Sequence, residues 1–132
     1  MQFAGLNYLA VLVAAIAGFG FGAVWYMIFG KPWMAAVGMS EQPQPAPGPF
    51  IAAFVCQLVM AWVLAGVIGH LGDITIGRSV VSAAFVWLGF VVTAMTVNHR
   101  FQGAPWALTL IDSGHWLGVL IVMGLVIGLF GV

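Results

Sequence analysis

Charged residues are scarce in this sequence. Only six of its 132 residues are Asp, Glu, Lys or Arg, and the formal net charge is zero. Soluble domains carry about 25% charged residues, whereas this chain carries 5% and is 64% hydrophobic. Such a composition cannot supply a water-exposed surface, and it leaves no basic patch for nucleic acid or for anionic lipid. The sequence therefore predicts a protein whose solvent is the lipid bilayer.

Cysteine and catalytic motifs are also scarce. The single cysteine, Cys56, has no partner for a disulfide within the chain. The sequence contains no serine nucleophile elbow, no paired carboxylates and no glycine-rich phosphate loop. We therefore expect a protein that is not an enzyme, uses no cofactor and binds no nucleic acid.

Long apolar stretches are what the chain has instead. Four of them, residues 6–29, 50–70, 79–98 and 107–130, reach the ~20 residues that a helix needs to cross a bilayer. Continuous apolar runs favour helices over the alternating strands of a membrane β-barrel. We expect an all-α membrane protein, with residues 1–132 forming a single bundle of four transmembrane helices.

The connections between the spans refine this picture. Residues 31–37 follow the first span, and Pro32 with Trp33 predicts that they form a short interfacial helix. Pro105 and Trp106 predict the start of the last span at the membrane interface. Aromatic residues near the span ends are expected to anchor the helices at the headgroups; these are Trp25, Tyr26, Trp33 and Trp106.

Membrane orientation rests on very few charges. Lys31 and Arg100 fall on one side of the membrane, and Arg78 with the N-terminal amine falls on the other. The positive-inside rule then places both termini outside the cytoplasm. The difference is small enough that dual topology remains an alternative.

Asp112 is the residue that points most directly to function. It lies inside the last span, where an ionised group costs a few kcal/mol or more, and His115 follows one helical turn later. One interpretation is structural, with the carboxylate neutralised by Arg100 or kept protonated by burial. The other is a proton carrier, hydrogen-bonded by His115. A metal site is less favoured, because no cysteine or second carboxylate joins the cluster.

Other polar residues are expected near Asp112. Spans three and four form a hairpin that turns near Gly103, so residues whose numbers sum to about 206 lie at one depth. This places Thr93 beside Asp112 and His115, with Gln57 or Arg100 close enough to join them. The candidate polar or proton site comprises Asp112, His115, Thr93, Thr96, Gln57, Arg100, His99 and Asn98.

Small residues predict where the helices pack. Gly114, Gly118, Gly124 and Gly128 lie on the face of the last span opposite Asp112, and Gly18 and Gly22 lie on the first span. Small residues spaced four apart allow close approach of membrane helices. Because lipid suits neither the glycine face nor the polar face, we expect a homo-oligomer or a larger membrane complex, with the lipid bilayer as the surrounding partner.

Two blocks of the sequence resemble the DUF1761 family. The first contains NYLAV from residue 7, GAVWY from residue 22 and GKPWM from residue 30; the second contains NHRFQG from residue 98, then Trp106, Asp112, Gly114 and Met123-Gly124. The resemblance implies a small bacterial protein with four spans, in the inner (cytoplasmic) membrane. It implies no activity, because the family is defined without one.

Two functions from different classes fit these observations. The first is proton-linked transport of a small solute or ion by a homo-oligomer, through the polar cluster around Asp112 and His115. The second is a non-catalytic accessory or assembly subunit that packs against a larger membrane complex. An integral-membrane enzyme ranks last, because the catalytic motifs are missing.

Overall fold

Every regular element in the part of the chain that the structure describes is a helix. The computed structural model describes residues 3–131, and these contain no strand. The helices are α1 (Tyr8–Val37), α2 (Pro47–Leu71), α3 (Ile76–Val86), the π-helical turn η1 (Trp87–Val91), α4 (Val92–Phe101) and α5 (Trp106–Phe130). Because α3, η1 and α4 run on as one span, four spans are long and apolar enough to cross a membrane. The prediction of an all-α fold with four transmembrane helices is confirmed, and it indicates a multi-pass integral membrane protein.

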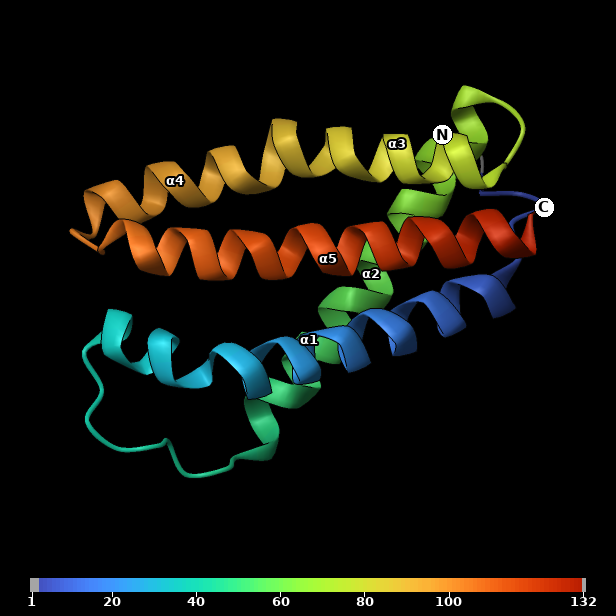
Figure 1. The fold of residues 1–132 in the computed structure, drawn as a ribbon. Helices are drawn as coiled ribbons and strands as arrows, with labels where there is room; N and C mark the ends of the chain where they lie inside the picture. Colours follow the sequence, from blue (N-terminus) through green and yellow to red (C-terminus); the bar gives the residue numbers. More distant parts are fainter. Residues whose placement is uncertain (1–2, 132) are drawn as a thin grey trace.

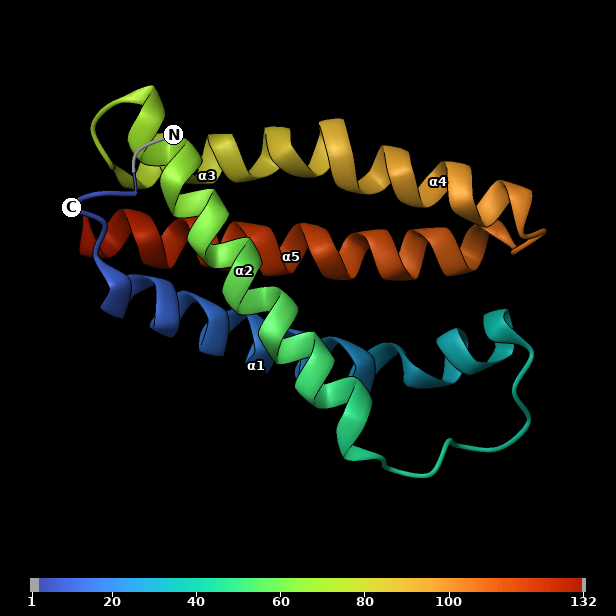
Figure 2. The same cartoon turned by 180° about the vertical axis from the view of Figure 1, so that it is seen from behind.

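Helix α5 occupies the centre of the arrangement. It packs between α1 on one side and the α3–η1–α4 span on the other (Figure 1). Helix α2 crosses these three spans obliquely on one face (Figure 2). Both termini and the α2–α3 connection lie at one end of the molecule, which we call the terminal end. The α1–α2 loop and the α4–α5 turn lie at the opposite end, which we call the loop end.

The helix ends follow from local sequence. Helix α1 begins after Asn7, whose side chain accepts the N–H of Ala10 at 3.1 Å. It ends at Gly38, whose φ of 87° is the left-handed conformation that favours glycine. At the loop end, Gly103 with φ 69° turns the chain back, and α5 begins directly after Pro105 as the sequence predicts.

The interfacial helix predicted for residues 31–37 is not a separate element. Helix α1 continues through Pro32 and ends at Val37. Proline has no N–H for the carbonyl four residues earlier, which loosens a helix at that point, and Figure 1 shows α1 bending in this region. One missing hydrogen bond does not end the helix, because Met34 and the two alanines after it favour helical conformation.

The π-helical turn η1 changes which face of the third span meets α5. The N–H of Val92 donates to the carbonyl of Trp87, five residues earlier, which adds one residue to the turn. Phe90 is in phase with the buried Ser79 on a regular helix, yet it is 76% exposed. Val91, one position later, is partly buried instead. Beyond η1, the packed face is therefore carried by residues one position later than helical periodicity predicts.

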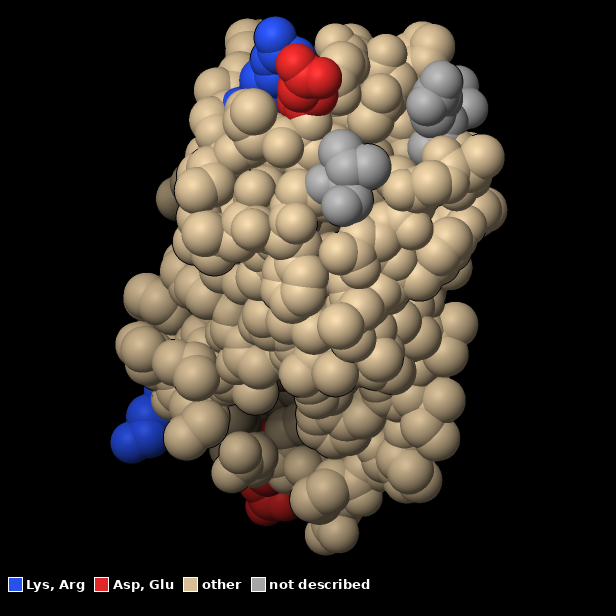
Figure 3. Space-filling view, turned by 90° about the vertical axis from the view of Figure 1, so that its right-hand side faces the viewer, with Lys and Arg blue, Asp and Glu red and all other residues tan. Residues whose placement is uncertain are grey.

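The terminal end contains an apolar core. Its fully or almost fully buried residues include Ala61, Leu64, Ala65, Ile68, Met123 and Ile127. A Cβ at Gly124 would lie 2.8 Å from the backbone oxygen of Ser79, and one at Gly128 would lie 2.6 Å from Cα of Ile76. Helices α3 and α5 thus pack backbone against backbone here. Figure 3, which faces this end, shows few charged side chains, with one blue and red group side by side at the top, on an otherwise uncharged surface.

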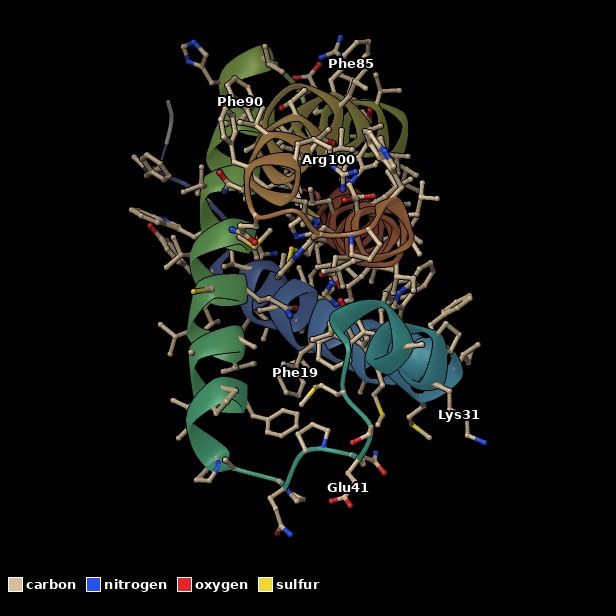
Figure 4. The ribbon with its side chains drawn as sticks, turned by 90° about the vertical axis from the view of Figure 1, so that its left-hand side faces the viewer. Phe19, Lys31, Glu41, Phe85, Phe90 and Arg100 are labelled. Carbon is tan, nitrogen blue, oxygen red and sulfur yellow. The ribbon has the colours of Figure 1, made fainter. Side chains whose placement is uncertain are left out.

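The third span has far less contact with the rest of the chain than α5 has. In their most apolar stretches, 6% of its residues are buried, against 44% for α5. Phe85 and Phe90 point away from the neighbouring helices at 68% and 76% exposure (Figure 4). Large apolar side chains in this position suit contact with lipid or with another membrane helix.

Candidate functional site

Asp112 receives its hydrogen bond from helix α1. The hydroxyl of Tyr26 donates to Oδ1 of Asp112 at 2.6 Å, and both side chains are partly buried. The sequence predicts Tyr26 as an interface anchor, whereas the structure turns it toward α5. The intramembrane carboxylate therefore has a neutral hydrogen-bond donor on the facing helix.

Two tryptophans fix the turn of α5 that carries Asp112. The indole N–H of Trp25 on α1 donates to the carbonyl of Ile111 at 3.1 Å. The indole N–H of Trp87 on η1 donates to the carbonyl of Ser113 at 2.8 Å. The accepting carbonyls belong to the residues on either side of Asp112, and the donors come from two different spans. Sequence reasoning missed this arrangement, because an indole on a membrane helix is usually an interface anchor.

His115 lies beside Tyr26 and is almost completely buried. It is 6% exposed, and its ring centroid is 4.8 Å from that of Tyr26 and 4.6 Å from that of Trp116. Its Nδ1 is buried without a hydrogen-bond partner. The structure thus gives Asp112 its hydrogen bond from Tyr26 and not from His115, and Tyr26 contacts both groups.

Arg100 turns inward at the loop end. Its Nη2 donates to the hydroxyl of Thr109 at 2.8 Å, and its guanidinium carbon lies 3.7 Å from the ring centroid of Trp106. Nδ1 of His99 lies 2.8 Å from the same hydroxyl. Figure 4 shows Arg100 pointing into the space between α4 and α5. The contacts of Arg100 are thus with Thr109 and Trp106, and the structure records no ion pair between Arg100 and Asp112.

Three other predicted residues are not brought to Asp112. Thr93 is exposed, and its hydroxyl donates to the carbonyl of Gly89 on its own helix at 2.8 Å. Thr96 bonds in the same way to the carbonyl of Val92 at 2.6 Å. Asn98 is exposed and lines a shallow surface hollow of about 370 Å³. The extra residue in η1 explains the position of Thr93, because it shifts by one position the face of the third span that packs on α5.

Gln57 lies deeper than the sequence predicts. It is 3% exposed, and its Oε1 lies 3.0 Å from where a Cβ on Gly18 would be. Gly18 precedes Tyr26 by eight residues, which is ~12 Å along α1 toward the terminal end. Gln57 therefore does not join Asp112. Counting depth by residue number fails here because α2 does not begin level with the α4–α5 turn: its first residues already lie part of the way toward the terminal end (Figure 2).

The glycines of α5 are used within the chain, against two different neighbours. A Cβ at Gly114 would lie 2.9 Å from the Trp25 ring, and one at Gly118 would meet the ring of Phe21, both on α1. Gly124 and Gly128 instead admit the backbone of α3. The glycine face of α5 is thus covered by α1 and α3 of the same chain. Its small residues therefore give no reason to expect self-association.

The chemistry open to this arrangement is proton exchange. The phenol of Tyr26 donates to Asp112 and the imidazole of His115 contacts the Tyr26 ring; both groups hydrogen-bond without carrying charge in their ordinary neutral forms. Within residues 3–131 there is no group of three His, Cys, Asp or Glu side chains that could hold a metal ion. The carboxyl group of Asp112 can therefore bind or release a proton while the Tyr26 hydroxyl continues to donate to it.

Of the comparisons with known proteins, the one with family models gives a match. Searches of curated proteins and of solved structures find no match to this chain. The model of the family described as "Protein of unknown function (DUF1761)" matches residues 9–128, which is nearly the whole chain. This confirms the resemblance seen in the sequence, and the chain belongs to the DUF1761 family.

Proposed function

We propose that this membrane protein transports a small solute or ion in a proton-linked way and that Asp112 is the proton-binding group. The observation that carries the proposal is the 2.6 Å hydrogen bond from Tyr26 to Asp112. A carboxylate that served only as a structural ion pair would face a cation, and the cation that the sequence suggests for it, Arg100, is bound to Thr109 and stacked on Trp106. Intramembrane carboxylates without a fixed counter-charge are typical of proton relays.

The proton-binding step needs no rearrangement of the hydrogen bond. One oxygen of Asp112 accepts from Tyr26, and the other oxygen takes up or releases the proton. The bond from Tyr26 strengthens when the carboxylate is ionised, because bonds to charged acceptors are stronger than those to neutral ones. The loop end supplies further polar groups, His99 and Thr109, through which a proton can exchange with water. The proposal places the protein in the bacterial cytoplasmic membrane and treats it as a non-enzymatic homo-oligomer.

Proton flux in reconstituted liposomes tests the proposal. The purified full chain is inserted into liposomes that contain a pH-sensitive dye, and a potassium gradient with valinomycin sets the membrane potential. We expect wild-type flux well above that of empty liposomes and loss of this flux in Asp112→Asn. Asp73→Asn is the matched control, because Asp73 is exposed in the α2–α3 connection. Wild-type flux equal to that of empty liposomes, or full flux in Asp112→Asn, overturns the proposal.

The fold of the Asp112→Asn variant is itself informative. The amide oxygen of asparagine can still accept the hydrogen bond from Tyr26, and no buried cation loses its partner. The variant should therefore remain folded by circular dichroism and size-exclusion chromatography. Unfolding of this variant would instead support a structural role for the carboxylate.

An accessory role remains the second candidate, and the exposed third span favours it. Only 6% of the residues in its most apolar stretch are buried within the chain. If the span packs against a larger complex, the tagged chain should migrate with that complex on native gels of its own membranes. Migration of this kind, together with no Asp112-dependent flux, would replace the transport proposal.

A further inference from the structure

A hollow of about 370 Å³ lies on the third span near the loop end. All of its lining residues belong to η1, to α4 or to Gln102 directly after α4, so no other span of the chain covers it. Within residues 3–131, α2 packs against α3 but does not approach η1 or α4. Figure 2 shows α2 and α4 moving apart toward the loop end. We call this open recess the loop-end hollow; in a bilayer it faces lipid.

The lining of the loop-end hollow changes from polar to apolar along the helix axis. Its polar side chains, Asn98, His99 and Gln102, lie within ~8 Å of Gly103 in the α4–α5 turn. Its apolar side chains begin about 12 Å from that turn and continue to about 20 Å; they are Met95, Ala94, Val91 and Phe90. Half of the hydrocarbon region of a bilayer is about 15 Å thick. The hollow therefore runs from interface depth into the hydrocarbon of one leaflet.

The π-helical turn builds the deep end of this hollow. Because η1 holds one extra residue, Val91 is partly buried and Phe90 is 76% exposed. The ring of Phe90 projects away from the neighbouring helices (Figure 4). Ala94, one helical turn later, has only a methyl group. A large projecting side chain followed by a small one on the same face leaves a recess between them and the polar residues beyond.

The polar end of the hollow presents uncharged hydrogen-bonding groups. The amides of Asn98 and Gln102 are exposed, and each can donate two hydrogen bonds. The hydroxyl of Thr109 accepts from Arg100, so its own proton is free for Nδ1 of His99 at 2.8 Å. With Nδ1 as the acceptor, the neutral ring carries its proton on Nε2 and keeps one donor. The polar end can therefore donate to oxygen atoms at interface depth.

We propose that the loop-end hollow binds one glycerophospholipid of the surrounding leaflet. The phosphate and ester oxygens of the lipid accept hydrogen bonds at the polar end, from Asn98, Gln102 and His99. One acyl chain lies along Ala94 and Met95 and ends against the ring of Phe90. No Lys or Arg lines the hollow, because Arg100 turns toward Thr109 and Trp106. The site thus recognises the phosphoglycerol region that these lipids share and does not select the charge of the headgroup.

The order of the lining residues favours a phospholipid over other occupants. An apolar helix of a second copy would match Phe90 and Met95 and would leave the amides of Asn98 and Gln102 facing hydrocarbon. A chain without a polar head would leave the same groups unused. Only an amphiphile whose polar part stands at the interface matches both ends of the hollow at their depths.

A second hollow, at the terminal end, provides the control. It measures about 410 Å³ and lies between α1 and α2. Its lining is almost entirely apolar, from Val11, Leu58 and Val59 with the rings of Tyr8 and Trp62, and the Tyr8 hydroxyl already donates to the carbonyl of Phe3. Acyl chains can lie in this second hollow, but it has no comparable set of donors for a phosphate group.

Native mass spectrometry of the full chain tests the proposal. The chain is released from nanodiscs that contain phosphatidylethanolamine, phosphatidylglycerol and diacylglycerol with the same acyl chains in equal amounts. We expect wild type to retain one phospholipid, of either headgroup, several-fold more often than diacylglycerol. Ala94→Trp fills the loop-end hollow from an exposed position and should lose this adduct. Val59→Trp fills the terminal-end hollow, also from an exposed position, and should keep it.

A variant that leaves the hollow open tests the polar end separately. Asn98→Leu combined with Gln102→Leu removes both amides and keeps similar volumes, so phospholipid should fall to the level of diacylglycerol. Circular dichroism checks that each variant is folded. The proposal is overturned if wild type retains diacylglycerol as well as phospholipid or retains neither, or if Ala94→Trp keeps the adduct. A lipid-free dimer that Ala94→Trp dissociates would also overturn it and would assign the hollow to a second copy of the chain.

Discussion

The two ends of this helix bundle are held together by different interactions. At the loop end, long polar and aromatic side chains connect α5 to its neighbours, through the hydrogen bonds of Tyr26, Trp25, Trp87 and Arg100. At the terminal end, α5 meets α3 backbone to backbone at Gly124 and Gly128, beside fully buried aliphatic side chains. The first kind of contact can rearrange by side-chain rotation, whereas the second cannot change without moving a helix.

This difference indicates where the molecule can do chemistry. A site that binds and releases a proton needs groups that reorient, and such groups lie around Asp112. The buried side chains of the terminal end are mostly apolar, with Ser79 as a fully buried polar one, so few groups there can exchange a proton. The comparison predicts that the same kind of substitution has different consequences at the two ends.

The largest expected effect is at the terminal end, in Gly124→Ala. The added methyl would lie 2.8 Å from the backbone oxygen of Ser79, so α3 and α5 must separate. We expect a loss of about 3 kcal/mol in the free energy of unfolding, the upper part of the range for overpacked cores. Gly118→Ala places its methyl against the Phe21 ring, which can rotate, and should cost about 1 kcal/mol.

Unfolding of the purified chain in mixed micelles with increasing dodecyl sulfate measures both values. Gly20→Ala, which adds a methyl in open space on α1, gives the reference. Equal losses for Gly124→Ala and Gly118→Ala would show that the backbone contact is no more rigid than the aromatic one, and the distinction between the two ends would be lost.

The next-largest loss in the free energy of unfolding is expected at the loop end, in Tyr26→Phe. This change removes the hydroxyl that donates to Asp112 and leaves the ring contact with His115 in place. We expect a loss of about 2 kcal/mol in the same unfolding assay, the magnitude of a hydrogen bond to a charged group. Tyr8→Phe is the matched control, since Tyr8 is exposed and donates to the carbonyl of Phe3. A Tyr26→Phe variant as stable as Tyr8→Phe would contradict the hydrogen bond.

Sequence reasoning predicts the framework of this protein well and its site only in part. Apolar length gives the four spans, and Pro105 with Trp106 gives the start of α5. Asp112 is singled out by the cost of a charge in hydrocarbon. These predictions depend on one residue or one segment at a time, and for that reason they can be made without knowing the packing.

The partners of Asp112 depend on how separate helices are rotated toward one another. Tyr26 and Trp25 are consecutive on α1, and helical periodicity alone does not say that both side chains reach α5. The π-helical turn at Trp87 has no proline or other sequence signal, yet it shifts the face that Thr93 occupies. The depth of Gln57 is predicted wrongly because α2 begins part of the way toward the terminal end, which apolar length does not reveal.

The smallest expected effect is the contact between Arg100 and Trp106. The guanidinium lies 3.7 Å from the ring centroid, and lysine keeps the charge but loses the planar stacking surface. A double-mutant cycle with Arg100→Lys and Trp106→Leu should give a coupling of about 0.5–1 kcal/mol, as for an exposed cation–π pair. The same cycle repeated in a Thr109→Val protein lacks the hydrogen bond from Arg100 to Thr109. It therefore measures the contact between Arg100 and Trp106 by itself. A coupling of zero would mean that the indole adds no stability here, and the loop end would then depend on its hydrogen bonds to α5 alone.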